Sequence, residues 1–217
     1  MTRPVLTISS KNYSSWSLRG SLLCQLAGLE VEEQIVSIDD PTNRAELLLL
    51  TPSVLVPRLN HDGASVWDTL AIAEYLAELY PAAGMLPEDR LARAHCRSIS
   101  GEIHSGFHNL RSALPMNLKA HHDSFKVFAG AQPDIDRVQA IWEECLDRHG
   151  GPFLFGTPTI ADAMFAPVCT RFLTYSVPMT KPAKAYCRTI MSWPPMMRWI
   201  EAARKEPDEM EELDVEF

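Results

Sequence analysis

The sequence predicts a small α/β domain followed by an all-helical domain. Two observations indicate this division. β-prone runs alternate with helical patterns over the first eighty residues, and β-type alternation is absent after a linker of turn residues at 80–87. With 46% hydrophobic residues, the chain can bury a substantial core. We therefore expect an α/β domain over residues 1–81 and a helical domain over residues 87–217.

The first domain is expected to follow the order β-α-β-α-β-β-α, a small mixed sheet with helices on its faces. Turn residues and helix-ending signals separate its elements. The expected elements are strand 5–9, helix 16–27, strand 31–38, a short helix 44–50, two strands at 56–59 and 65–67 around a turn, and a helix starting near Thr69.

The stretch 55–76 carries the densest local signals. Pro57 has no N–H for a sheet ladder, so it opens an edge-like strand or follows a cis peptide bond. Asp68 and Thr69 form an N-cap position before apolar residues at helical spacing. The free N–H groups of this helix start favour a carboxylate, and the Asp68 and Thr69 side chains beside them can take an ammonium. The pattern therefore suits a bound zwitterion.

The order V-P-x-L, a turn, Asp-Thr and A-I-x-x-Y-L resembles the glutathione-binding half of the cytosolic glutathione transferases. The resemblance implies a thioredoxin-like domain with glutathione as cosubstrate. It further implies that the Val56 backbone before a cis Pro57 pairs with the cysteinyl part of glutathione, and that Asp68 and Thr69 hold its γ-glutamyl end. It also implies a homodimer.

The second half is predicted to be helical throughout. Apolar residues at three- and four-residue spacing predict one long amphipathic helix over 91–114, and a second pattern runs over 134–150. Thr159 and Asp162 then form a capping box at the start of an apolar helix that runs to about Tyr175. The motif T-I-A-D-A-x-x-A-P-V resembles the capped core helix of the glutathione transferase C-terminal domain. The resemblance covers residues 4–204, and the acidic segment after it is expected to be a solvated tail.

A glutathione enzyme must raise the thiolate fraction of its cosubstrate, and a helix N-terminus with a hydroxyl can do so. The run S-S-W-S-L-R at 14–19 is similar to the S-S-C-x-W-R opening of zeta-class members, in which the first serine is the thiolate donor. We predict that Ser14 is the catalytic residue and that Ser14 and Ser15 both contact glutathione. Ser15 and then Tyr13 are the alternatives, and both serines can simply cap the helix. Trp16 replaces the cysteine of the zeta pattern, which disfavours thiol-transfer chemistry.

The glycine end of glutathione has no clear anchor in the sequence. Leu55 stands where relatives often have lysine or glutamine before the cis-proline. Lys11 is a candidate substitute, although nothing in its spacing decides the matter.

The family places its second-substrate pocket between the domains. The candidate side chains either overlook that cleft or pack in the core. His104 and His108 are four residues apart and can bind a metal on one helix face, but no third ligand is evident, so no metal is predicted. The candidates are Tyr13, Trp16, His104, Phe107, His108, Arg111, Arg171 and Tyr175.

Two enzymatic functions and one binding function fit the resemblance. Zeta isomerases have an arginine where this sequence has Thr174, while Arg171 lies one turn earlier and Arg111 is expected on the opposite wall. Burying a maleyl-type diacid without cationic partners is costly. We therefore predict conjugation of glutathione to a small hydrophobic electrophile. The alternatives are glutathione-dependent cis-trans isomerisation of such a diacid and a non-catalytic binding protein of this fold.

Composition and charge argue against several kinds of partner and against secretion or a membrane span. The formal charge is -8, but most of it lies in the acidic stretch 205–217, so the remainder is nearly neutral and does not favour nucleic acid or an anionic membrane surface. No signal peptide or transmembrane stretch is evident, so a cytoplasmic protein is expected. Five cysteines without a C-x-x-C pair indicate reduced core thiols rather than disulfides or structural zinc.

Overall fold

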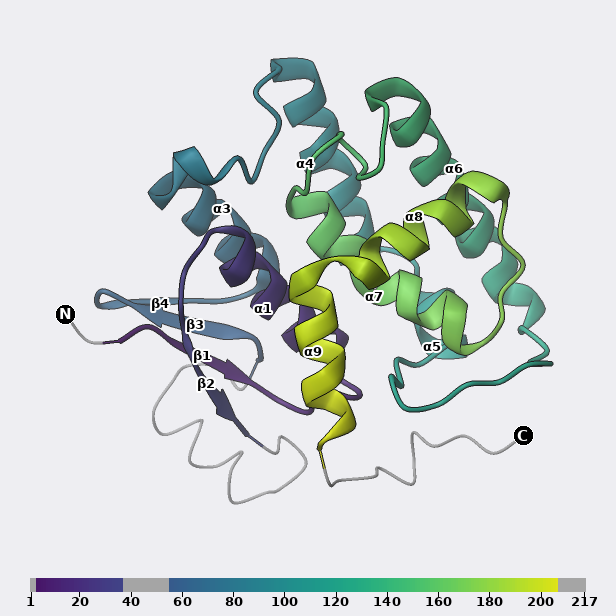
Figure 1. Cartoon of the computed structure of the whole chain (residues 1–217), viewed down its shortest axis with the longest axis horizontal. Coiled ribbons are helices and arrows are strands. Elements are labelled where there is room, and N and C mark those ends of the chain that lie inside the picture. Colours follow the sequence, from purple (N-terminus) through teal and green to yellow (C-terminus); the bar gives the residue numbers. More distant parts are fainter. Residues whose placement is uncertain (1–2, 37–54, 207–217) are drawn as a thin grey trace.

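The computed structural model describes residues 3–36 and 55–206, and it places a small sheet beside a larger group of helices (Figure 1). The first part contains β1 (Val5–Ile8), α1 (Ser15–Leu26), β2 (Glu32–Ile35), β3 (Arg58–His61), β4 (Ala64–Val66) and α3 (Thr69–Leu79). The second part contains α4 (Arg90–Ser105), α5 (His108–Ala113), α6 (Gln132–His149), α7 (Ile160–Thr174), α8 (Lys181–Ser192) and α9 (Pro194–Arg204). Short 3-10 turns lie at η1 (Pro81–Ala83) and η2 (Ala129–Ala131).

The described strands form one mixed sheet in the order β2-β1-β3-β4. β1 pairs in parallel with β2, so their connection crosses over through α1, and β1 and β3 pair antiparallel, as do β3 and β4. The hairpin turns at Asp62 and Gly63, which both have positive φ. This arrangement follows the predicted order, except that the expected helix 44–50 lies outside the described residues.

The first helix approaches the sheet most closely where it meets Pro57. A Cβ on Gly20 of α1 would lie 2.6 Å from the Pro57 Cβ, so only glycine fits at this contact. The Val56–Pro57 peptide bond is cis, which confirms one of the two alternatives that the sequence left open. α1 also packs against α3, and this layer buries Leu6, Leu22 and Ile72 completely.

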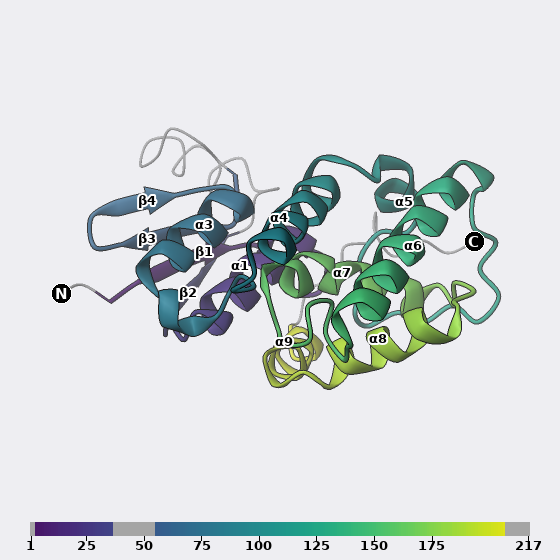
Figure 2. The same cartoon turned by 90° about the horizontal axis from the view of Figure 1, so that it is seen from above.

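The helical half is built around α7, which contacts both α4 and α1. Figure 2 shows α4 and α7 in the middle, with the sheet on one side and α5, α6 and α8 on the other. Nearly every residue of α7 is buried, as its largely apolar sequence requires. The predicted capping box is confirmed: the Asp162 carboxylate accepts a hydrogen bond from the Thr159 N–H at 2.8 Å.

The predicted long helix over 91–114 is wrong, because the chain breaks between α4 and α5. Gly106 adopts an extended conformation and Phe107 is left-handed, with φ 58°. A carboxylate from α6 starts the new helix, since Asp134 accepts a hydrogen bond from the Leu110 N–H at 3.0 Å. Ile103 and Leu110 are buried on either side of the break and Phe107 is buried within it, so apolar spacing alone did not reveal it.

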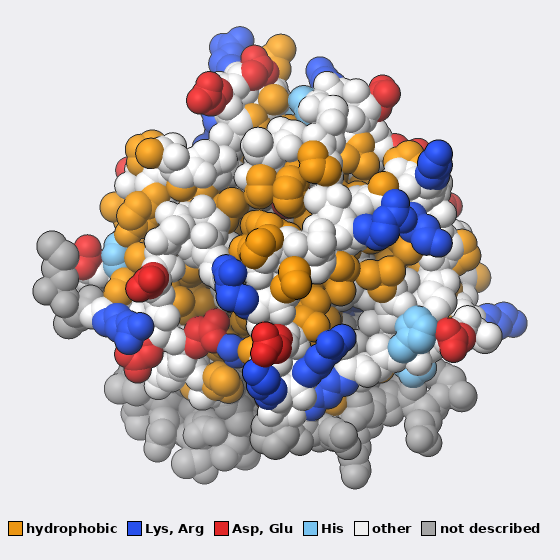
Figure 3. All heavy atoms as spheres, viewed as in Figure 1, with side chains coloured by type: hydrophobic (Ala, Val, Ile, Leu, Met, Phe, Trp, Pro, Cys, Tyr) orange, Lys and Arg blue, Asp and Glu red, His pale blue; other side chains and the backbone are white. Residues whose placement is uncertain are grey.

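All five cysteines are buried with free thiols. Burial raises the pKa of Cys24 and Cys145 to about 12 and that of Cys96 to about 11, so these thiols are protonated and unreactive at neutral pH. On the face in Figure 3, positive and negative side chains are interspersed with apolar ones. Within residues 3–36 and 55–206, no helix is long and apolar enough to cross a membrane.

Candidate active site

Ser14 lies at the N-terminus of α1, at the end of the loop that follows β1. Ser14 is the N-cap residue: its hydroxyl accepts a hydrogen bond from the Ser17 N–H at 3.2 Å and donates to the Ser17 Oγ at 2.8 Å. Ser14 is half-buried, and the first turn of α1 contains no acidic residue. The helix start therefore carries a positive dipole end without an acidic side chain of its own to balance it.

Ser15 points to the helical half. It is 8% exposed, and its hydroxyl accepts a hydrogen bond from Nη2 of Arg171 at 3.2 Å. The same arginine donates through Nη1 to the backbone carbonyls of Arg111 and Leu114, at 2.9 and 2.6 Å. Arg171 thus connects α7, the end of α5 and the start of α1.

Two further arginines contact the ring of Trp16. The guanidinium of Arg19 is 4.4 Å from the centre of this ring and that of Arg111 is 5.0 Å away. The Arg19 side chain is buried and donates to the carbonyls of Met164 and Ser15. We call Arg19, Arg111 and Arg171 the arginine cluster.

The arginine cluster is an electropositive region. Burial lowers the pKa of Arg19 well below its usual value, and the charges of Arg171 and Arg111 lower it further. Burial, followed by the charge of Arg111, lowers the pKa of Arg171 to about 10. Among the described residues, no carboxylate forms an ion pair with any of the three. The positive charge of the cluster thus has no carboxylate partner in the part of the chain that the structure describes.

Asp68 caps α3 and also reaches the helical half. Its Oδ1 accepts a hydrogen bond from the Leu70 N–H at 2.9 Å, and its Oδ2 lies 3.0 Å from Nε2 of His104. His104 in turn packs edge-on against Trp16, with ring centres 5.3 Å apart. Nearly half of the Asp68 side chain remains exposed, so it can still accept a hydrogen bond from a ligand.

Thr69 follows at the start of the same helix and is completely buried. Its hydroxyl is enclosed and has no hydrogen-bond partner in the described part of the protein. A buried hydroxyl without a partner is costly. This orphaned group fits a site whose ligand completes the hydrogen bonding.

Lys11, the candidate anchor for the glycine end of glutathione, already has partners within the protein. The ammonium of Lys11 pairs with Glu33 and lies 5.2 Å from the ring centre of Trp199. Leu55 is exposed at the other candidate position, Val56 is half-buried and Pro57 is buried. Lys11 is thus directed to structural partners.

The remaining predicted residues are dispersed. Phe107 is buried beside the helix break, and His108 is exposed on α5. The break also places His104 and His108 in different helices, and no group of three metal-ligating side chains is found in the described part of the chain. Tyr13 lies in the turn before α1, where its N–H donates to Ser10 Oγ at 3.3 Å.

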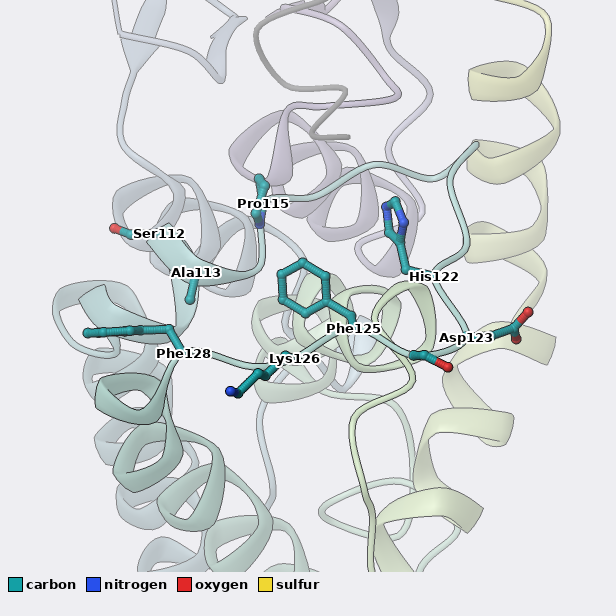
Figure 4. A pocket seen from close by; sticks show the side chains of 9 residues that line it. Ser112, Ala113, Pro115, His122, Asp123, Phe125, Lys126 and Phe128 are labelled. Atoms are coloured by element: carbon teal, nitrogen blue, oxygen red, sulfur yellow. The ribbon is translucent and has the colours of Figure 1, made fainter. Parts of the chain in front are cut away.

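Tyr175 contacts two of the side chains that line a cavity of about 620 Å³. Its ring stacks on that of His122, with ring centres 5.2 Å apart, and packs against that of Phe125, with ring centres 4.7 Å apart. Figure 4 places Phe125 between Pro115 and His122. One wall is the segment 112–115, next to the carbonyls that Arg171 binds.

Sequence reasoning missed the residues that hold the loop before Ser14. Asn12 is completely buried and bonds to Asn117, while Glu206 accepts hydrogen bonds from three donors of residues 10–12. These pairs lie more than a hundred residues apart. A polar turn such as K-N-Y-S-S gives no local signal of such partners.

Comparison with known proteins agrees with this architecture. Models of the glutathione S-transferase N-terminal and C-terminal domains match residues 13–79 and 125–202. A probable maleylacetoacetate isomerase of Caenorhabditis elegans is 31% identical over 170 residues, 76% of this chain and 77% of that protein. The maleylacetoacetate isomerase of Rattus norvegicus is 34% identical over 169 residues, 76% of each chain.

Solved structures show the same fold. A glutathione transferase homologue from Burkholderia with bound glutathione has a TM-score of 0.70 at 24% identity, covering 94% of this chain and 99% of that one. A bacterial zeta-class maleyl pyruvate isomerase has a TM-score of 0.71 at 22% identity, covering 95% and 100%. The predicted fold class is confirmed. The chain belongs to the cytosolic glutathione S-transferase superfamily.

Proposed function

We propose that this protein is a glutathione-dependent cis-trans isomerase of a maleyl-type diacid. The sequence alone favoured conjugation, but relatives from Caenorhabditis elegans, Rattus norvegicus and Pseudomonas aeruginosa are maleylacetoacetate isomerases by name, and they support the alternative. Glutathione is then a cosubstrate that is regenerated in each cycle, and no metal is needed.

Glutathione binds at the starts of α1 and α3 in this proposal. The Asp68 carboxylate takes the ammonium of the γ-glutamyl end, the Thr69 hydroxyl completes its contacts, and the Val56 backbone pairs with the cysteinyl part. The thiol is directed to the N-terminus of α1, where Ser14 donates to the thiolate. To do so, its hydroxyl turns from the Ser17 Oγ, 2.8 Å away. Ser15 is the alternative donor, since Arg171 leaves the Ser15 proton available.

The isomerisation is a reversible addition. The thiolate adds to one carbon of the cis double bond, forming a C–S bond, and the π electron pair moves into the conjugated carbonyl as an enolate. Rotation about the resulting single bond, followed by return of the electron pair, expels the thiolate and leaves the trans isomer. The reaction has no net oxidation or reduction. Cationic groups near the enolate oxygen stabilise the charge that develops.

The observation that carries this proposal is the position of Arg111 in the arginine cluster. Arg19 and Arg171 are buried, and their donors are directed to backbone carbonyls and to Ser15. Arg111 is only half-buried and lies over Trp16, with weak contacts from Nη1 to the carbonyls of His104 and Gly106 at 3.5 and 3.4 Å. We infer that Arg111 binds a substrate carboxylate, while its two neighbours supply positive charge from behind.

Conjugation to a small electrophile remains the second candidate. It uses the same thiolate, and the sequence has Thr174 where zeta isomerases have an arginine. Thr174 is buried and donates to the Asn117 carbonyl at 3.1 Å, so it does not replace a cation. In either reaction we propose a homodimer, as the family resemblance implies, with domains over 1–81 and 87–217. We also propose that it is cytoplasmic, as the sequence led us to expect.

Assaying both reactions on one preparation tests the proposal. We expect isomerisation of maleylacetone, and we expect Arg111→Gln to lower its kcat/KM by about 10- to 100-fold, the cost of one charged hydrogen bond. Conjugation of a neutral aromatic halide should change little. Arg137→Gln is the matched control, because it removes an exposed arginine that pairs with Glu102 outside the cluster.

Three results would contradict the proposal. Conjugation without measurable isomerisation in the unmodified protein would favour a transferase. Equal losses in both reactions for Arg111→Gln would mean that this arginine supports the site generally rather than binding the diacid. Failure of both reactions despite glutathione binding would favour the non-catalytic alternative.

A further inference from the structure

Glu206 fastens the loop that precedes the catalytic serine. Its Oε2 accepts hydrogen bonds from the Ser10 hydroxyl at 2.7 Å and the Asn12 N–H at 3.0 Å, and its Oε1 accepts from the Lys11 N–H at 2.8 Å. One carboxylate just beyond α9 therefore satisfies three donors in a loop almost two hundred residues earlier. We call these three hydrogen bonds the Glu206 clasp.

Residues of the helical half hold both Glu206 and the loop 10–12 by further hydrogen bonds. Lys119 Nζ donates to the backbone carbonyl of Glu206 at 2.5 Å, and the N–H groups of Leu118 and Lys119 donate to the Asn12 side-chain oxygen at 2.7 and 3.1 Å. The Trp199 indole N–H donates to the Lys11 carbonyl at 2.9 Å. The loop thus keeps several anchors that do not depend on the Glu206 carboxylate.

Ser10 connects the clasp to Ser14. The Ser10 hydroxyl that donates to Glu206 also accepts from the N–H groups of Asn12 and Tyr13, at 3.1 and 3.3 Å. The Ser10 carbonyl accepts the Ser14 N–H at 3.0 Å. Ser10 therefore links the Glu206 carboxylate to the Ser14 backbone, through its hydroxyl on one side and its carbonyl on the other.

We propose that Glu206 is a positioning residue for the thiolate donor: through Ser10 it holds Ser14 in the geometry that stabilises the glutathione sulfur. Glu206 does not contact glutathione in this proposal. Its loss leaves the Asn12 and Trp199 anchors in place, so the loop stays attached but Ser14 is less well oriented. The inference rests on the proposed role of Ser14.

The test compares Glu206→Ala with Glu206→Gln, which keeps one carbonyl oxygen as an acceptor. The control is Glu201→Ala, which removes an equal charge five residues earlier, where Glu201 pairs with Lys205 on the surface. The ultraviolet absorbance of bound glutathione thiolate is titrated against pH in each variant, together with turnover at neutral pH and the affinity for glutathione.

We expect Glu206→Ala to raise the apparent pKa of the bound thiol and to lower turnover at neutral pH by about tenfold, since one pKa unit changes the thiolate fraction tenfold. Glutathione affinity should change by less than about twofold, because the ammonium site at Asp68 is untouched. Glu206→Gln should recover part of the loss, and Glu201→Ala should match the unmodified protein.

An unchanged thiol pKa in Glu206→Ala would overturn the inference, as would a parallel change in Glu201→Ala. Amide hydrogen exchange separates this failure from failure of the proposed function. If the unmodified protein shows no bound thiolate, the proposed role of Ser14 fails. If the Ser14 amide exchanges faster in Glu206→Ala but not in Glu201→Ala, the positioning of Ser14 by Glu206 is still supported. If its exchange is unchanged in Glu206→Ala, that positioning is rejected.

Discussion

The helices α1 and α7 both start at a hydroxyl N-cap, Ser14 and Thr159, but the surroundings of the two caps differ. At α7 the Asp162 carboxylate accepts hydrogen bonds from the N–H groups of Leu154 and Thr159, from the Thr159 hydroxyl and from Tyr186. At α1 the Ser14 hydroxyl caps a first turn that has no acidic residue, and the next residue, Ser15, accepts a hydrogen bond from the buried Arg171. The start of α7 is therefore filled by a carboxylate of the protein itself. The first turn of α1 has no acidic residue, so its positive dipole end favours an anionic ligand.

The largest effect on stability is expected for Asp162→Ala. Burial raises the pKa of Asp162 to about 6, yet its carboxylate satisfies donors that lie too deep to reach water. Their loss should lower the free energy of unfolding by about 3 kcal/mol or more. Asp136→Ala, on the exposed face of α6, is the control for urea denaturation. A loss below about 1 kcal/mol would remove the distinction between the two helix starts.

Asp68→Ala should affect binding more than stability. An ammonium left without its carboxylate loses about 1.5 to 3 kcal/mol, so we expect glutathione affinity to fall by about 10- to 100-fold in calorimetry. Asp89→Ala is matched to it, because Asp89 caps α4 through the Ala92 N–H at 2.7 Å. If both variants bind glutathione equally well, Asp68 is only a helix cap.

Ser14→Ala should reduce turnover at neutral pH by about tenfold and raise the apparent pKa of bound thiol by about one unit, while glutathione affinity changes less. Raising the pH should partly restore the rate. Thr180→Ala is a suitable control, since Thr180 caps α8 through the Ala183 N–H. An unchanged thiol pKa would identify Ser14 as structural and make Ser15 the next candidate.

The smallest effect is expected for Thr159→Ala. Removing this hydroxyl should lower the free energy of unfolding by about 1 kcal/mol, because Asp162 keeps its other donors. Glutathione affinity should stay the same. A large loss of binding in the folded variant would show that the start of α7 is coupled to the site after all.

Local signals predicted most of the fold. The cap at Asp68, the turn before β4 and the capping box at Thr159 are short-range features, and each appears where the sequence placed it. The break at Phe107 was missed because the apolar spacing continues across it, and its stabilising carboxylate, Asp134, comes from another helix.

The site was less predictable than the fold. The serine, proline and aspartate positions followed from motifs, and their roles stay predictions. The pairing of Asp68 with His104, the contact of Ser15 with Arg171 and the Glu206 clasp join residues far apart in the sequence. No periodicity or turn signal specifies such pairs, because they depend on how the two halves pack.

The contact of Arg171 with Ser15 bears on how this protein can be recombined with its relatives. Helix α1 forms hydrogen bonds with the helical half of the chain. Ser15 accepts a hydrogen bond from Arg171, and Arg19 donates one to the Met164 carbonyl. A chimera that exchanges the helical half would therefore replace part of the surroundings of the proposed thiolate donor as well as the proposed substrate pocket. We expect activity in such a chimera to depend on both halves together, so that neither half acts as an interchangeable module.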